Sequence, residues 1–176
     1  MLIQRCSSTA RASGLLLVAC LLLYACSEQS SESNPVEDPL GRVISTTGCK
    51  SFQNPTDASG AAQSCVLYRY DEERQLLELT HENAAFNCCP EEIGADISID
   101  GGLIVISEWE RDALCDCNCL YDVEMVIEQL QPGAYTIAFE EPYRTTEDTE
   151  LRFAVDVAAE PSGRICVPRT HYPWGI

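Results

Sequence analysis

Eight cysteines that follow residue 40 limit most strongly how this chain can fold. They are Cys49, Cys65, Cys88, Cys89, Cys115, Cys117, Cys119 and Cys166. In an oxidising compartment such an even set forms up to four disulfides, which then hold the domain together. The neighbours Cys88 and Cys89 do not readily bond to each other, because a ring closed across a single peptide is strained. Both are therefore expected to bond to cysteines on other strands.

The spacing of the cysteines suggests partners. In an extended chain Cys115, Cys117 and Cys119 point to the same side and would offer a ladder of partners to Cys88 and Cys89. Neighbouring strands supply the Cα separation of roughly 4.4–6.8 Å that a disulfide needs.

The remaining three cysteines complete the set. Cys49 and Cys65 flank a polar loop, and we expect them to pair, while Cys166 would fasten the last strand. The full connectivity cannot be read from the sequence, since eight cysteines allow 105 pairings.

A second chemistry is open to the five clustered cysteines. As thiols they could bind zinc or copper(I), or take part in redox exchange, and the residues concerned would be Cys88, Cys89, Cys115, Cys117 and Cys119. Zinc ribbons usually use Cys-x-x-Cys knuckles, which this chain lacks. Disulfides are therefore favoured, and no cofactor or metal is expected.

The hydropathy pattern from about residue 40 has a period of two, which is typical of strands. Residues 96–100 alternate, and Asp100-Gly101 separates them from the apolar run 103–109, which predicts a hairpin. Alternation returns at 119–127, 135–139 and 151–157, and two further strands are expected at 65–70 and 75–81. About seven or eight strands without a helix predict an all-β, antiparallel β-sandwich over 40–176, Ig-like in general form and stapled by disulfides.

The first 25 residues have the pattern of a secretory leader. A polar stretch with Arg5 and Arg11 precedes 12 mostly apolar residues, 14–25. A membrane-spanning helix needs about 20 apolar residues, whereas the apolar core of a signal peptide needs only about 7–15. We therefore expect residues 1–25 to be a signal peptide.

The end of this leader, Leu23-Tyr24-Ala25-Cys26, resembles the lipobox of bacterial lipoproteins. The resemblance implies cleavage before Cys26 and a diacylglyceryl thioether on its sulfur. Tyr24 departs from the pattern, where a smaller residue is usual, and Cys20 is the alternative acceptor. Residues 27–39 are rich in Ser, Glu and Pro and predict a flexible tether. Ser27 resembles the outer-membrane sorting signal of enteric bacteria, so the expected place is the bacterial cell envelope, lipid-anchored in the outer membrane.

Charge restricts the partners. The formal charge is −17, and removal of the two leader arginines makes it −19. Such a surface repels nucleic acid, which we exclude as a partner. Carboxylate runs at 71–73 and 147–150 match no defined calcium loop and are expected to be solvated turns.

No catalytic motif stands out in the sequence. His81 lies on the strand face of Leu77 and Leu79 and is expected at a sheet edge or at the rim of the core, and His171 lies in the C-terminal tail. A Ser/His/Asp set assembled by folding stays open, because triads are defined by geometry. Exposed aromatic side chains could form a sugar platform, although Trp109 is expected in the core; the candidates are Trp109, Tyr143, Tyr172 and Trp174.

Two functions fit these features. The first is a non-catalytic binding or structural module, tethered to the membrane by lipid and directed at an unknown protein or carbohydrate ligand. The alternative is a thiol-based metal-binding or redox protein of the cell envelope. Whether the chain is an enzyme is left open, with a binding role preferred.

Overall fold

The computed structural model describes residues 38–50 and 62–170. The predicted leader, Cys26, most of the predicted tether, His171, Tyr172 and Trp174 lie outside the described residues. The compact unit that carries the described strands spans Val36–Ile176. Across the described part of the chain, no helix is long and apolar enough to cross a membrane.

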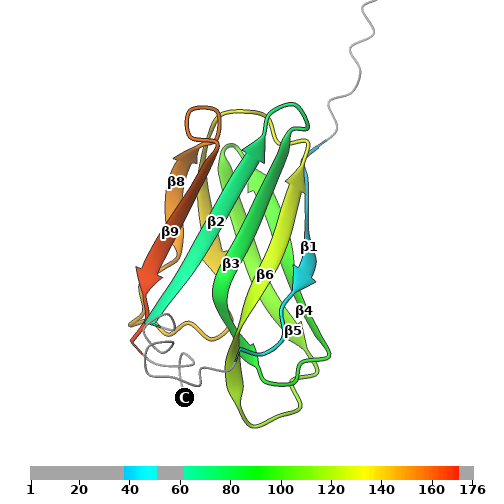
Figure 1. Ribbon diagram of the computed structural model, residues 1–176, viewed down its shortest axis with the longest axis vertical. Coiled ribbons are helices and arrows are strands. Elements are labelled where there is room, and N and C mark those ends of the chain that lie inside the picture. The colour runs from blue at the N-terminus through cyan, green and yellow to red at the C-terminus, as the bar shows by residue number, and fades with distance from the viewer. Residues whose placement is uncertain (1–37, 51–61, 171–176) are drawn as a thin grey trace, which may run out of the picture. The chain divides into compact units, whose positions relative to one another are not determined.

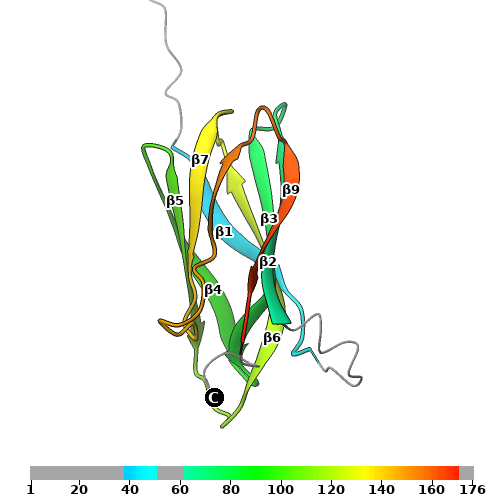
Figure 2. The ribbon, with the colours of Figure 1, turned by 90° about the vertical axis from the view of Figure 1, so that its left-hand side faces the viewer.

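In the described residues, nine strands form two sheets that pack face to face (Figures 1 and 2). Sheet A has the order β1 (Leu40–Thr46), β6 (Asn118–Glu128), β3 (Leu76–Asn87), β2 (Gln63–Asp71) and β9 (Ser162–Pro168). Sheet B has the order β4 (Glu92–Asp100), β5 (Leu103–Arg111), β7 (Ala134–Glu140) and β8 (Arg152–Asp156). The expected disulfide-stapled β-sandwich is confirmed, and residues 38–50 and 62–170 contain nine strands where seven or eight were predicted.

The core lies between the sheets and follows from the alternation of apolar residues. On β6 one face is buried, from Cys119 through Val123 to Ile127, as the period of two predicts. Leu77 and Leu79 on β3 face Ile104 and Ile106 on β5 within the same apolar cluster. Side chains on the two inner faces thus fill a single core, as in other sandwiches.

The predicted hairpin at Asp100-Gly101 is confirmed. Asp100 pairs with Leu103, and the two turn residues Gly101 and Gly102 have φ of 53° and 97°. Both values lie in the left-handed region, which glycine enters without steric cost, so this turn requires its glycines.

One pair of strands departs from the predicted antiparallel arrangement. β5 and β7 are parallel neighbours, with Leu103 opposite Thr136 and Ser107 opposite Glu140. The chain leaves sheet B after β5, runs through β6 in sheet A, and returns as β7. A crossover of this kind allows two neighbouring strands to run in the same direction.

Candidate functional site

All eight cysteines in the described residues are paired in four disulfides. The pairs are Cys49–Cys119, Cys65–Cys166, Cys88–Cys117 and Cys89–Cys115. The expectation that these cysteines are oxidised and that Cys166 fastens the last strand is therefore confirmed. Cys65 on β2 lies directly opposite Cys166 on β9, with Cα atoms 4.0 Å apart.

The predicted pairing of Cys49 with Cys65 is wrong. The segment after β1 runs beside β6, because the Thr47 amide donates to the Asp122 carbonyl at 2.9 Å and the Lys50 amide to the Leu120 carbonyl at 2.8 Å. This places Cys49 next to Cys119, the first core-facing residue of β6. Closeness in sequence across the polar loop did not decide the partner.

Cys88 and Cys89 bond to Cys117 and Cys115, as the sequence predicted, but the cysteines do not form a strand ladder. Only Cys119 belongs to β6, because the chain loops over residues 112–117, starting at Asp112 with φ of 52°. Adjacent Cys88 and Cys89 therefore reach two different points of this loop.

Asn87 organises the loop. Its side-chain nitrogen donates to the Cys115 carbonyl at 2.5 Å, and its side-chain oxygen accepts from the amides of Cys89 and Cys115 at 3.1 and 3.3 Å. The Cys88 amide donates to the Cys117 carbonyl at 2.9 Å. These bonds hold both chain segments in place beside the disulfides.

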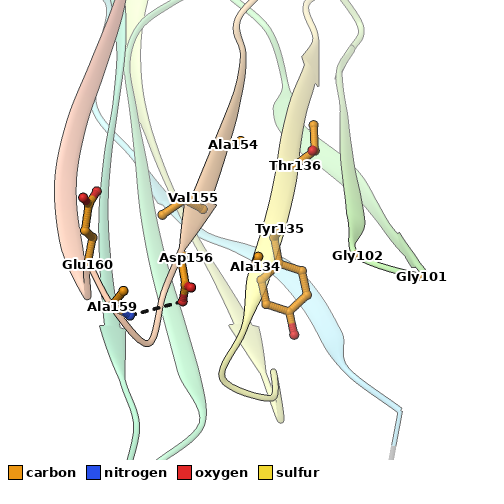
Figure 3. Close-up of a pocket in the computed structure, with 10 residues that line it drawn as sticks. All are labelled: Gly101, Gly102, Ala134, Tyr135, Thr136, Ala154, Val155, Asp156, Ala159 and Glu160. Atoms are coloured by element: carbon orange, nitrogen blue, oxygen red, sulfur yellow. Dashed lines mark hydrogen bonds between the residues drawn. The ribbon is translucent and has the colours of Figure 1, made fainter.

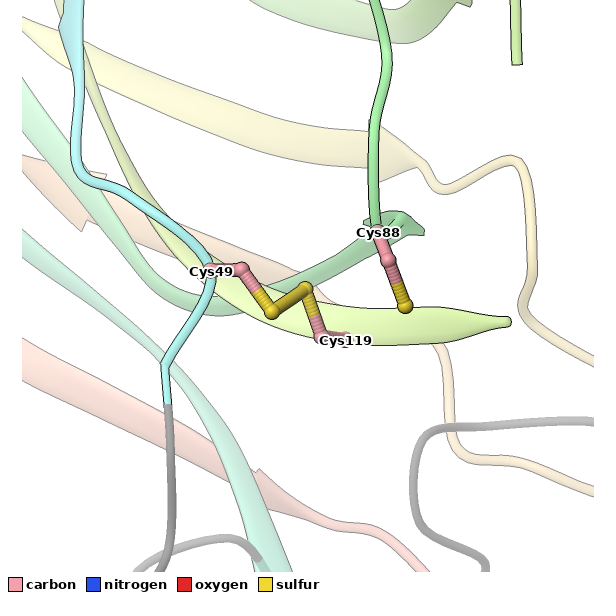
Figure 4. Close-up of side chains that lie close together, drawn as sticks. All are labelled: Cys49, Cys88 and Cys119. Carbon is pink, nitrogen blue, oxygen red and sulfur yellow. A yellow bond between two sulfur atoms is a disulfide. The ribbon is translucent and has the colours of Figure 1, made fainter. Parts of the chain in front are cut away.

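Three sulfur atoms gather at this end of the sandwich. The Sγ atoms of Cys49, Cys88 and Cys119 all lie within 4.8 Å of one another (Figure 4). The set differs from the five-cysteine cluster proposed from sequence, because Cys49 joins it from a distant segment and Cys89, Cys115 and Cys117 do not belong to it.

A second polar group lies inside the core, around His81. His81 Nε2 is hydrogen-bonded to Ser64 Oγ at 2.7 Å. The other ring nitrogen, Nδ1, lies 2.7 Å from Glu108 Oε1. Ser64 and His81 are fully buried and Glu108 is 6% exposed. β2 and β3 of sheet A supply the first two residues and β5 of sheet B supplies the third, so the group joins the two sheets.

His81 was predicted at a sheet edge or core rim, and this is wrong. β3 is the central strand of sheet A, and His81 shares its inner face with Leu77 and Leu79. The ring packs 4.9 Å from the Phe139 ring, centroid to centroid. The predicted strand face was right, but the position of β3 in the sheet was not available from sequence.

Charge is balanced around this histidine. Glu141 Oε1 lies 3.8 Å from His81 Nε2, and the same carboxylate pairs with the buried guanidinium of Arg169. Burial by itself lowers the pKa of His81, but the charges of Glu108 and Glu141 and the hydrogen bond to Glu108 outweigh it, so the pKa is raised above 6.5. When His81 is protonated, its positive charge and that of Arg169 balance the negative charges of Glu108 and Glu141.

The Ser64–His81–Glu108 set has the order of contacts of a catalytic triad. A nucleophile must reach a substrate, however, and Ser64 is not exposed at all. The arrangement instead pairs buried charged groups across the two sheets, since an unpaired buried charge is costly, while the second oxygen of Glu108 has no hydrogen-bond partner among the described residues. Sequence reasoning missed Glu108, Glu141 and Arg169 because they come from segments far apart in the chain.

Trp109, expected in the core, lies on the outer face of sheet B. On β5 the inward residues are Ile104, Ile106 and Glu108, so Trp109 points outward and is partly exposed. Its ring covers Gly94 on β4, where a Cβ atom would meet the indole at 2.3 Å. The alternation of residues on β5 predicted a strand, but it did not show which of the two faces of that strand points into the core.

A groove of about 360 Å³ opens beside Trp109. It runs between the edge strands of the two sheets, along Gly41–Thr46 of β1 and Glu92–Ala95 of β4. Arg111 lies over the Trp109 ring at 5.6 Å from its centroid and pairs with Glu92 at 2.7 Å. The groove thus combines an aromatic ring, ionic groups and strand edges, which suits a polar or extended ligand.

A second groove of about 440 Å³ lies at the β4–β5 turn (Figure 3). Its walls are mostly small residues, with Tyr135, Asp156 and Glu160 as the larger side chains. Asp156 Oδ1 accepts the amides of Ala158 and Ala159 at 3.1 Å, so this carboxylate serves its own turn.

Carboxylates in the runs at 71–73 and 147–150, considered as calcium ligands from the sequence, bind to the backbone of their own turns. Asp71 accepts a hydrogen bond from the Arg74 amide at 3.1 Å, and Asp148 accepts from the amide and hydroxyl of Thr145 at 3.1 and 2.9 Å.

The Tyr143 hydroxyl donates to Glu110 at 2.5 Å, and this bond, together with burial, raises the pKa of Tyr143 to about 12.

Comparison of the chain with protein-family models, with curated proteins and with solved structures gave no significant match.

The buried charge network predicts a specific dependence of stability on pH. Because the pKa of His81 is raised in the folded state, its contribution is complete below 6.5 and is lost as the pH rises through the raised value. The free energy of unfolding should therefore fall from pH 6.5 upward, as measured by urea unfolding. His81→Gln should remove this slope and His171→Gln should keep it. Equal slopes in the wild type and in His81→Gln would contradict the assignment.

The contact of Trp109 with Gly94 can be tested by adding one methyl group. Gly94→Ala should push the indole outward, shift its fluorescence to longer wavelength and lower the free energy of unfolding by about 1–3 kcal/mol. A Trp174→Phe background leaves Trp109 as the single tryptophan of the chain. Gly48→Ala is the control, because a Cβ there meets nothing within 4 Å. Unchanged emission in Gly94→Ala would show that the ring does not cover Gly94.

Proposed function

We propose that this protein is a lipid-anchored binding module of the bacterial cell envelope. The observation that carries the proposal is the pairing of all eight described cysteines in disulfides. Disulfides persist in oxidising compartments outside the cytosol, which agrees with the export that the leader predicts. The fold offers the rigidity of a recognition domain with cross-links at the ends of its strands.

Attachment through Cys26 agrees with the way the domain begins. β1 starts at Leu40, opposite Glu128 at the end of β6, whereas Cys119 lies near the start of β6. The tether would therefore join the sandwich at one end, and the cysteine cluster would lie at the other. At about 3.3 Å per residue, the length of β6 separates the two ends by roughly 30 Å.

The groove beside Trp109 is the surface we propose for ligand binding. The partly exposed indole offers apolar surface to a sugar ring or an apolar side chain, and the Arg111–Glu92 pair, with Arg111 over the ring, offers hydrogen bonds. Protein and carbohydrate ligands both fit this chemistry. A negative net charge of −17 for the whole chain disfavours nucleic acid.

The anchor is tested by replacing the acceptor thiol. Cys26→Ser should abolish incorporation of labelled fatty acid and leave a larger, unprocessed precursor on a gel, because the thioether cannot form. Cys20→Ser should be labelled and processed like the wild type. Normal labelling of Cys26→Ser would move the anchor to another residue, with Cys20 the first to examine.

A further inference from the structure

Two neighbouring disulfides share one small space at the cysteine-rich end of the domain. The Sγ atoms of Cys49, Cys88 and Cys119 lie within 4.8 Å of one another, and Cys117 is bonded to Cys88. In Figure 4 the sulfur of Cys88 lies beside the Cys49–Cys119 disulfide. The sulfur of Cys117, bonded to that of Cys88, therefore lies beside this group of three.

Backbone hydrogen bonds hold these segments together independently of the sulfur–sulfur bonds. Thr47 and Lys50 bind to β6 on either side of Cys49, and the Lys50 ammonium group lies 2.5 Å from Asp122. Cys119 pairs with Phe86 in the β3–β6 ladder, and the Cys88 amide bonds to the Cys117 carbonyl. Reduction of the two disulfides would therefore leave the four thiols near their present places.

We propose that, once reduced, Cys49, Cys88, Cys117 and Cys119 form a four-thiolate site for a thiophilic divalent cation such as Zn²⁺. Zinc bound to four thiolates has Zn–S bonds of about 2.3 Å, which places the sulfurs about 3.8 Å apart. After reduction the sulfurs of each bonded pair move apart to this distance, while Cys88, within 4.8 Å of Cys49 and Cys119, moves about 1 Å closer to them. This inference goes beyond the proposed binding function and does not depend on it.

The chemistry balances with a dithiol as the reductant. Each of the two disulfides takes up two electrons and two protons, and two dithiol molecules become disulfides. Zn²⁺ then displaces one proton from each of the four thiols, and a Zn(SR)₄ centre and four protons result. In the reverse reaction two molecules of the oxidised dithiol take up four electrons and four protons, the four thiolates re-form both protein disulfides, and the ion is released.

The exposure of the ligands suits an ion that enters and leaves. Cys49 is exposed, Cys88 is partly exposed and Cys119 is buried, so the ion would enter from the side of Cys49. Cys89 and Cys115 lie in the same loop but are not in the sulfur group, and they provide a matched control. The buried Cys65 and its partner Cys166 are on a different pair of strands.

The proposal is tested on full-length mature protein that has been reduced with a phosphine and freed of reductant without oxygen. Co²⁺ serves as a coloured probe, and Zn²⁺ is then added to displace it. We expect one ion per chain, a thiolate-to-cobalt charge-transfer band, and a β-type circular dichroism spectrum with the ion bound. Cys49→Ser and Cys119→Ser should each weaken binding at least about tenfold.

The double variant Cys89→Ser/Cys115→Ser loses one disulfide from the same loop and should bind Co²⁺ within about twofold of the wild type. If this control loses affinity as much as Cys49→Ser does, the site is not the one proposed. Failure of the reduced wild type to bind either ion also overturns the proposal. The same holds if the reduced chain loses its β-type spectrum and Zn²⁺ does not restore it.

Discussion

The antiparallel pairing of β3 with β6 is the interaction on which the rest of this structure depends. The two strands stay in register from Leu77 opposite Ile127 to Asn87 opposite Asn118, with one irregularity at Asn83. Their inner faces supply much of the core, and β3 carries His81 into the middle of it. Where the pair ends, Asn87 and the two cysteines after it meet the loop that leads into β6. Three of the four disulfides form at that point.

The two sheets are joined by a charged group as well as by apolar packing. His81 and Ser64 come from sheet A, Glu108 comes from sheet B, and Glu141 and Arg169 follow β7 and β9. Ion pairs of this kind contribute less to stability than their short distances suggest, because each charge loses its hydration. Their partners are specific, however, so the group favours one relative placement of the sheets over others.

Much of the fold could be predicted from the sequence, because short-range patterns determine strands and turns. The alternation at 119–127 and the glycines after Asp100 correctly gave β6 and the β4–β5 hairpin. β1 and β9 were harder, because their sequences carry few apolar residues in regular alternation. The parallel β5–β7 pair depends on the path of β6 through the other sheet, and no local pattern reports that path.

The site was less predictable, because its members are distant in sequence. Cys49 pairs with Cys119, 70 residues away, and the charged group around His81 joins five segments. To predict that these residues lie together, the order and register of the strands must be known, and neither can be inferred from the residue types alone. What the sequence did provide was the strain argument for Cys88 and Cys89, which bond to Cys117 and Cys115, although these lie in a loop and not on the expected strand.

The central claim is that a fixed set of four disulfides locks the ends of the β3–β6 and β2–β9 pairs. Mass spectrometry of peptides from mature protein, alkylated and digested without reductant, measures this connectivity directly. The account predicts the linked pairs Cys49–Cys119, Cys65–Cys166, Cys88–Cys117 and Cys89–Cys115, with none of the eight thiols alkylated. Recovery of a Cys49–Cys65 link, or six or more alkylated thiols in freshly isolated folded protein, would contradict it.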